Sequence, residues 1–146
     1  MEQMEQKTRD YVYSFLAKES GVSPKAIKEH KDMGLVAVYD QDTDTIFIKD
    51  LKKIPTIDEL FAIAHEWRHV WQSKIHPEDL NDYRERAECQ DLEDYNNQPA
   101  EIDANAWAWI VVSKMLGGKG RPTFPSLSRE TVAKIEERKK ELETEE

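Results

Sequence analysis

The segment His65-Glu66-Trp67-Arg68-His69 places two imidazoles and a carboxylate at a spacing that suits metal chemistry. Residues four apart on a helix differ by about 40° around its axis, and their Cβ atoms lie about 5–6 Å apart. Both imidazoles would then reach one tetrahedral zinc ion at about 2.0–2.1 Å. Glu66 lies about 100° further round than His65, where its carboxylate would contact a metal-bound water rather than the metal. The alternative interpretation is a pair of histidines that cap or hydrogen-bond inside an ordinary core helix.

A catalytic zinc ion usually takes three protein ligands and keeps its fourth position for water or substrate. The best source of a third ligand is the segment from Gln98 to Trp107, which contains Glu101 and Asp103. These two carboxylates lie about 200° apart on a helix, so only one of them can face the ion. We choose Glu101, because Asn105 lies four residues later on the same face and can orient a ligand imidazole. The alternative for Glu101 is an acidic residue that the helix dipole favours near a helix start.

Capping and helix-breaking residues predict the two helices that carry these side chains. Thr56 and the glutamate three residues later have the spacing of a capping box, so a helix is expected from there to about Lys74. Pro99 suits the first position of a second helix, which should run to about Leu116 and end at Gly117-Gly118. A broad apolar stripe surrounds the histidines, so we expect the first of these helices to be buried over most of its surface. The stripe comprises Leu60, Phe61, Ile63, Ala64, Trp67, Val70 and Trp71.

The residues before this helix contain helical and strand patterns. Apolar residues recur at helical spacing over Glu2–Lys18, which predicts a first helix. Ser23-Pro24 reads as the cap and first position of a short helix toward His30. The β-prone runs Leu35–Tyr39 and Thr45–Ile48 are joined by a polar five-residue turn, which predicts a β-hairpin.

Two charged segments complete the expected architecture. The run from Glu78 to Glu93 is expected to be a solvated helix or loop over the site. Arg129–Glu146 has few apolar residues and is expected to form a solvated surface helix, with a dimer or partner contact as the alternative. The elements together predict an α+β fold. In it a small antiparallel sheet or hairpin packs on an active-site helix and a second ligand-bearing helix, with further helices at both termini.

The motif His65-Glu66-x-x-His69 followed by Glu101-x-x-Ala104-Asn105 resembles the gluzincin type of HExxH zinc metallopeptidase. It is most similar to the small ImmA/IrrE-like proteins of bacteria and their mobile elements. The strand Thr45–Ile48 and the helix start over Thr56–Phe61 also resemble that family's approach to the motif. The resemblance covers roughly residues 35 to 116.

This resemblance implies a minimal zincin-like domain with its active-site helix under a small sheet. It implies that Zn²⁺ is bound by His65, His69 and Glu101, with Glu66 as the general base. The family often has glycine before the second histidine, where this chain has Arg68, and the segment between the second histidine and the glutamate is long and charged here.

The chemistry expected of such a site is metal-assisted hydrolysis of a peptide bond, in which Glu66 takes a proton from water and returns it to the leaving amine. The oxyanion needs a further donor, and the candidates are Tyr95, Tyr83 and His76, each of which could equally be a packing or surface residue. The hairpin ending in Ile46-Phe47-Ile48 could supply an edge strand that pairs with an extended peptide substrate, or it could only complete the core.

Length and charge limit the remaining possibilities. The 146 residues suit one domain over 1–146. Thirty acidic against 21 basic side chains give a net charge of -9, which argues against nucleic-acid binding. No apolar stretch approaches a membrane span, and the single cysteine, Cys89, cannot form an internal disulfide. These features predict a cytoplasmic protein, with a composition that suits bacterial or phage origin, and leave its oligomeric state open.

The sequence therefore predicts a zinc-dependent peptidase that hydrolyses a specific intracellular protein or peptide substrate. Two alternatives stay open. One is a catalytically silent, zincin-like metal-binding sensor, and the other is a protein-interaction module without metal.

Overall fold

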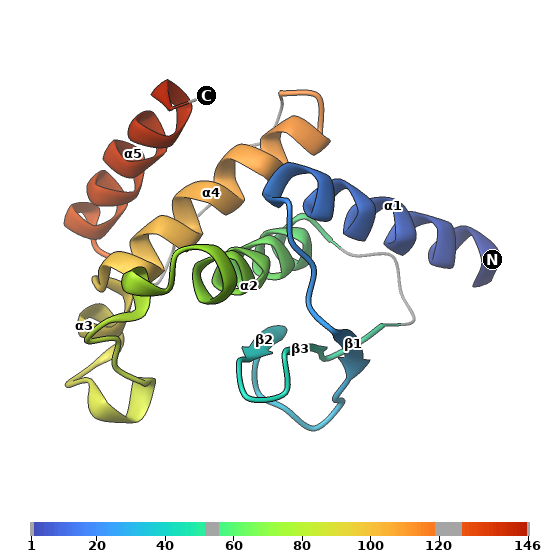
Figure 1. Ribbon diagram of the computed structural model, residues 1–146, viewed down its shortest axis with the longest axis horizontal. Helices are drawn as coiled ribbons and strands as arrows, with labels where there is room; N and C mark the ends of the chain where they lie inside the picture. Colours follow the sequence, from blue (N-terminus) through green and yellow to red (C-terminus); the bar gives the residue numbers. More distant parts are fainter. Residues whose placement is uncertain (1, 52–55, 119–126, 146) are drawn as a thin grey trace.

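The computed structural model describes residues 2–51, 56–118 and 127–145 of the chain. Within these ranges the protein has an α+β fold with five α-helices and one three-stranded mixed sheet (Figure 1), which confirms the predicted class. The sheet lies on one side of α2, and α4 and then α5 lie on the other. The elements are α1 (Glu2–Ser20), β1 (Ala26–Glu29), β2 (Ala37–Asp40), β3 (Thr45–Ile48), α2 (Ile57–Ile75), α3 (Leu92–Asn96), α4 (Pro99–Met115) and α5 (Arg129–Thr144).

The two central helices, α2 and α4, begin at the predicted capping residues. The Thr56 hydroxyl accepts a hydrogen bond from the Glu59 N–H at 3.2 Å, which satisfies one of the free donors at the start of α2. Pro99 occupies the first turn of α4, where its missing N–H leaves no bond unmade. After α4, Gly117 and Gly118 adopt positive φ angles of 72° and 84°, which favour glycine and end the helix.

The predicted hairpin is confirmed, but the sheet has a third strand. Strands β2 and β3 pair antiparallel, with Val38 opposite Phe47. Strand β1 pairs parallel with β3 on its other side, so the order is β1-β3-β2 and the sheet is mixed rather than antiparallel. As a result β3 is the central strand, and β2 is the edge strand that faces α2.

The short helix predicted after Ser23-Pro24 is wrong, because this segment forms β1. Its backbone bonds to the neighbouring strand, with the Lys25 N–H donating to the Asp44 carbonyl at 2.8 Å and the His30 N–H to the Ile48 carbonyl at 3.0 Å. So short a helix is marginal without tertiary support, whereas a strand added to a hairpin satisfies its backbone groups at once.

A single hydrophobic core joins the sheet and the helices. Trp67 is 1% exposed in its centre, and its indole N–H donates to the Val22 carbonyl at 2.9 Å. Trp107 is buried on α4, whereas Trp71 and Trp109 are only partly buried. Two of the four tryptophans are therefore fully part of the core. The buried cluster includes Val12, Leu16, Ile46, Ile48, Ile63, Ala64, Val70, Ile102, Ala106, Val111, Ile135 and Leu142.

Helix α5 is a surface helix, as its composition predicted, and one of its faces is buried. It lies alongside α4 (Figure 1), and Thr131, Ile135 and Leu142 are buried along that face. Its Arg138 Nε donates to an Asp103 carboxylate oxygen at 2.9 Å. Three well-spaced buried residues and one arginine are enough to attach this otherwise polar helix to α4.

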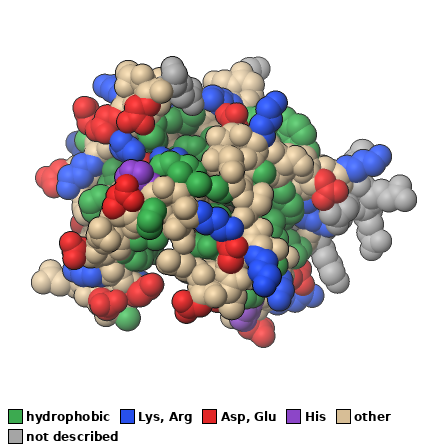
Figure 2. Space-filling model, viewed as in Figure 1, with side chains coloured by type: hydrophobic (Ala, Val, Ile, Leu, Met, Phe, Trp, Pro, Cys, Tyr) green, Lys and Arg blue, Asp and Glu red, His purple; other side chains and the backbone are tan. Residues whose placement is uncertain are grey.

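Among the described residues, no helix combines the length and the apolar character needed to cross a bilayer. Acidic and basic side chains are interspersed on the face shown in Figure 2, with apolar groups between them. Figure 2 therefore shows no broad area of a single charge on this face.

Candidate metal centre

The structure brings the three predicted ligands together. His65 and His69 extend from α2 and Glu101 from α4, and one donor atom from each lies within 4.8 Å of the others. The Nε2 atom of His65 lies 3.2 Å from that of His69 and 3.3 Å from Glu101 Oε1. The Nε2 atom of His69 lies 2.7 Å from Glu101 Oε2. His65, His69 and Glu101 form the candidate ligand group, which could hold a metal ion.

The donor set and its spacing fit zinc. Two imidazole nitrogens and one glutamate oxygen form a ligand set that catalytic zinc sites use. Ligands about 2.0–2.1 Å from a tetrahedral ion lie about 3.3 Å from one another, close to two of the three separations seen here. The side chains of His65, His69 and Glu101 are 15%, 11% and 3% exposed, so the group is mostly, but not completely, shielded from water.

Each imidazole is held at its outer nitrogen by an amide oxygen. His65 Nδ1 lies 2.6 Å from Asn105 Oδ1, the contact that the spacing of Asn105 and Glu101 on α4 predicted. His69 Nδ1 lies 2.7 Å from Gln72 Oε1. Amide oxygens only accept, so both Nδ1 atoms carry hydrogen and both Nε2 atoms face the centre of the group. Sequence reasoning missed Gln72, although its position three residues after His69 on α2 was a usable signal.

Glu66 lies beside the ligand group rather than in it. Its Oε2 is 3.7 Å from His65 Nε2, and its Oε1 accepts a hydrogen bond from the Tyr39 N–H at 2.8 Å. Because Tyr39 belongs to the edge strand β2, this bond links the carboxylate to the sheet. The placement is that of a group able to exchange protons with a molecule next to the ligands.

Asp103 points away from the three ligands. Its carboxylate accepts hydrogen bonds from Arg68 Nε at 2.7 Å and from Arg138 Nε at 2.9 Å. The 200° separation on α4 therefore divides the two buried carboxylates as expected, with Glu101 facing the histidines and Asp103 facing the arginines. Arg68, at the position where the resembled family often has glycine, is the buried partner of Asp103.

A cleft of about 760 Å³ lies next to Glu66 and His69. Strand β2 forms one wall, and Tyr83 and Tyr95 contribute to the other. The predicted hairpin therefore lies beside the cleft, and its edge there is β2, because β3 is paired on both sides.

Of the three candidate oxyanion donors, the two tyrosines line the cleft and His76 does not. The Tyr83 hydroxyl donates to Glu101 Oε2 at 3.2 Å and lies 2.8 Å from the Tyr95 hydroxyl. His76 is exposed and lies outside the group. Its Nδ1 lies 2.7 Å from Asp79 Oδ1, and its ring stacks on Trp71. The prediction of His76 as a possible oxyanion donor is therefore wrong.

The segment that carries Tyr83 and Tyr95 is held in place by side-chain hydrogen bonds, although much of it is exposed to solvent. It contains two 3-10 turns, Pro77–Leu80 and Arg86–Glu88, and the short helix α3. Arg84 forms a two-bond pair with Asp94 at 2.9 and 3.0 Å. The buried Gln98 side chain bonds both the N–H and the carbonyl of Arg84. These bonds hold the two tyrosines beside the ligand group.

Burial and neighbouring charges shift the pKa values of the three residues in the ligand group in opposite directions. Burial alone would raise the pKa of Glu101, but the charges and hydrogen bonds of the two histidines hold it well below its usual range. Burial alone would lower the pKa of His69, but the charge and hydrogen bond of Glu101 raise it to about 9. The pKa of His65 is raised by Glu101 against the same effect of burial. A bound divalent cation would replace these protons, so metal binding should release them.

Tyr83 keeps its proton in this setting. Burial, and after it the charge of Glu101, raises the pKa of Tyr83 far above its ordinary value. The hydroxyl is therefore neutral and able to donate a hydrogen bond at physiological pH.

Comparison with known proteins adds no further assignment. No protein-family model matches the chain, and neither the curated proteins nor the solved structures compared with it include a match.

Proposed function

We propose that this chain is a zinc-dependent peptidase of the HExxH type that hydrolyses a specific protein substrate. The observation that carries the proposal is the combination of a two-histidine, one-glutamate group with the separate carboxylate of Glu66 at one wall of a cleft. A purely structural histidine pair would not require a third donor at ligand distance or a cleft with an edge strand beside it.

The ligand group supplies the binding site for the ion. His65, His69 and Glu101 would hold Zn²⁺, and a bound zinc ion polarises a carbonyl group and lowers the pKa of water toward 7. Asn105 and Gln72 keep the imidazoles turned so that their Nε2 atoms face the group.

Glu66 would move the proton. Its carboxylate accepts a proton from the attacking water and then donates it to the amine of the departing peptide. The bond from the Tyr39 N–H holds one carboxylate oxygen toward β2 and leaves the other on the side of the ligands. Of the described hydroxyl groups that line the cleft, that of Tyr83 lies within hydrogen-bond distance of a ligand, and we assign it the role of oxyanion donor, for which its proton would turn from Glu101 Oε2 to the oxyanion.

Strand β2 would hold the substrate backbone. Its outer edge makes no strand pair among the described residues, and it lines the cleft from Ala37 to Asp40. An extended peptide added to this edge would place a backbone carbonyl beside Glu66 and the ligand group.

Removal and return of zinc tests the function. The purified protein should cleave members of a degenerate peptide library, detected by mass spectrometry as new amino termini. Treatment with 1,10-phenanthroline should abolish this cleavage, and added Zn²⁺ should restore it, whereas Ca²⁺ should not, because a compact nitrogen and oxygen donor set disfavours the larger ion. Cleavage that survives complete removal of metal would contradict the proposal.

A further inference from the structure

A buried polar network continues from the ligand group into the core. Gln72 lies on α2, is fully buried, and contacts His69 through its amide oxygen. Its amide nitrogen donates to the Ala100 carbonyl at 3.0 Å and to Asp103 Oδ2 at 2.9 Å. Both the amide oxygen and the NH₂ group of Gln72 therefore have hydrogen-bond partners.

The partners of Gln72 fix which way its amide faces. The carbonyl of Ala100 and the carboxylate of Asp103 can only accept, so both must face the NH₂ group. The amide oxygen is then left for His69, where it can only accept. If the amide were reversed, its NH₂ would face His69 Nδ1 and its oxygen would face two acceptors, with no hydrogen between them.

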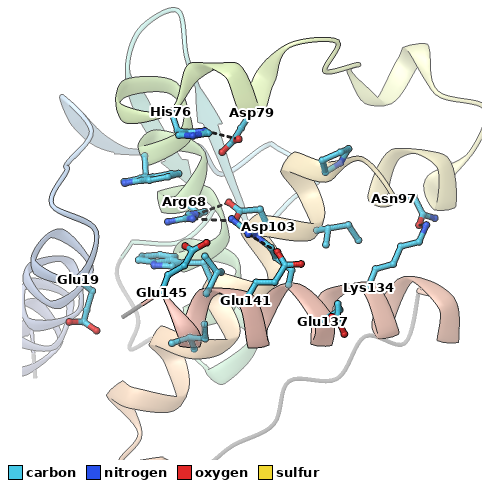
Figure 3. A pocket seen from close by; sticks show the side chains of 17 residues that line it. Glu19, Arg68, His76, Asp79, Asn97, Asp103, Lys134, Glu137, Glu141 and Glu145 are labelled. Atoms are coloured by element: carbon cyan, nitrogen blue, oxygen red, sulfur yellow. Dashed lines mark hydrogen bonds and ion pairs between the residues drawn. The ribbon is translucent and has the colours of Figure 1, made fainter.

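Asp103 is itself held by two arginines from different helices. Arg68 on α2 donates to both of its oxygens, at 2.7 and 3.2 Å, and Arg138 on α5 donates to one of them at 2.9 Å. Figure 3 shows Arg68 and Asp103 facing one another beside a cavity of about 970 Å³. The ligands and Glu66 do not line this cavity, so the arginines lie on a different side of the helix pair from the cleft.

We propose that Gln72, oriented by Asp103, is a positioning residue that determines which nitrogen of His69 faces the metal. With Nδ1 committed to the Gln72 oxygen, Nε2 is the nitrogen of His69 that faces Glu101 and His65. The inference rests on the proposed metal site. It adds a role for Gln72, which contacts His69 directly, and for Asp103 and its two arginines, which act on His69 through Gln72.

The test replaces Gln72 by methionine, which has a similar volume and no amide. A matched control is Thr45→Val, which also removes a buried polar group with a backbone partner but leaves His69 and the residues around it untouched. Zinc affinity is measured by competition with a chromogenic chelator, and circular dichroism establishes that each variant is folded. We expect Gln72→Met to weaken zinc binding by about 10- to 100-fold and Thr45→Val to change it less than about threefold. Equal zinc affinity of folded Gln72→Met and wild type would overturn the inference.

A second measurement on the wild-type protein needs no variant and no hydrolysis. With ¹¹³Cd²⁺ as the probe, the coupling of cadmium to imidazole nitrogens in ¹⁵N-labelled protein identifies the bound atom. We expect Nε2 for His69, together with a slowly exchanging Nδ1 proton. Coordination through Nδ1 would overturn the inference.

The two proposals fail separately. If the loaded protein cleaves nothing, the peptidase function is wrong, while the cadmium spectrum still decides the role of Gln72. If no metal binds, the Nδ1 proton of His69 in the wild type decides it. Protection from exchange that is lost in Gln72→Met supports the orientation, and rapid exchange in both proteins contradicts it.

Discussion

The substitution Glu66→Gln is expected to leave zinc bound and to lower peptide cleavage by at least about 10²- to 10⁴-fold, the usual contribution of a general acid–base group. Glutamine keeps the size of the side chain and can still accept from the Tyr39 N–H, so the local structure should persist. It cannot take a proton from water. The measurements are zinc content after gel filtration and the initial rate of cleavage of a library-derived peptide.

Glu85→Gln is the matched control, because Glu85 also lines the cleft but is not one of the proposed ligands. This variant should cleave at close to the wild-type rate. A Glu66→Gln protein as active as the wild type would remove the proposed base. If the biological effect of the protein in cells were unchanged by Glu66→Gln, the metal-binding sensor would become the better account.

Asp103→Ala is expected to lower the free energy of unfolding by about 3–5 kcal/mol. The reason is that Arg68, whose side chain is 7% exposed, would keep its charge in the core without the carboxylate that balances it. Urea denaturation of the purified protein at pH 7 measures the effect. The control is Glu141→Ala, since Glu141 is a 53% exposed partner of Arg138 and its loss should cost less than about 1 kcal/mol.

The contribution of Asp103 to the free energy of unfolding should also decrease at low pH. Burial alone would raise the pKa of Asp103, but hydrogen bonds and charge from Arg68 lower it below its ordinary value of 3.8. A group whose pKa is lower when folded stabilises the fold fully above its unfolded pKa and loses that effect as pH falls through the folded value. The gap in stability between wild type and Asp103→Ala should therefore be constant near neutral pH and shrink below about pH 4. A gap that widens on acidification would contradict this assignment.

The ligand group was predictable because its signals are local. His65 and His69 share a helix face by spacing alone, and the cap at Thr56 fixes where that helix begins. The choice of Glu101 over Asp103 followed from their angular separation on α4, and the structure directs them to opposite partners. Helical periodicity was therefore enough to select residues that come from two separate elements.

What sequence reasoning missed depends on partners far along the chain. Ser23-Pro24 has the local signature of a helix start, but the following residues pair with a strand some twenty residues later. Arg138 looks like one charge among many on α5 until Asp103, thirty-five residues earlier, is placed opposite it. Pairing and burial of this kind are tertiary effects that override local propensity.

Zinc content is the most direct test of the metal centre. Protein purified without added metal and analysed by inductively coupled plasma mass spectrometry should contain close to one zinc ion per chain. Glu101→Ala should lose most of it, while Asp42→Ala, which removes another carboxylate of the cleft, should keep it. If folded wild-type protein takes up no stoichiometric zinc, even when zinc is supplied, or if Glu101→Ala binds it as tightly as the wild type, then His65, His69 and Glu101 do not form the centre described here.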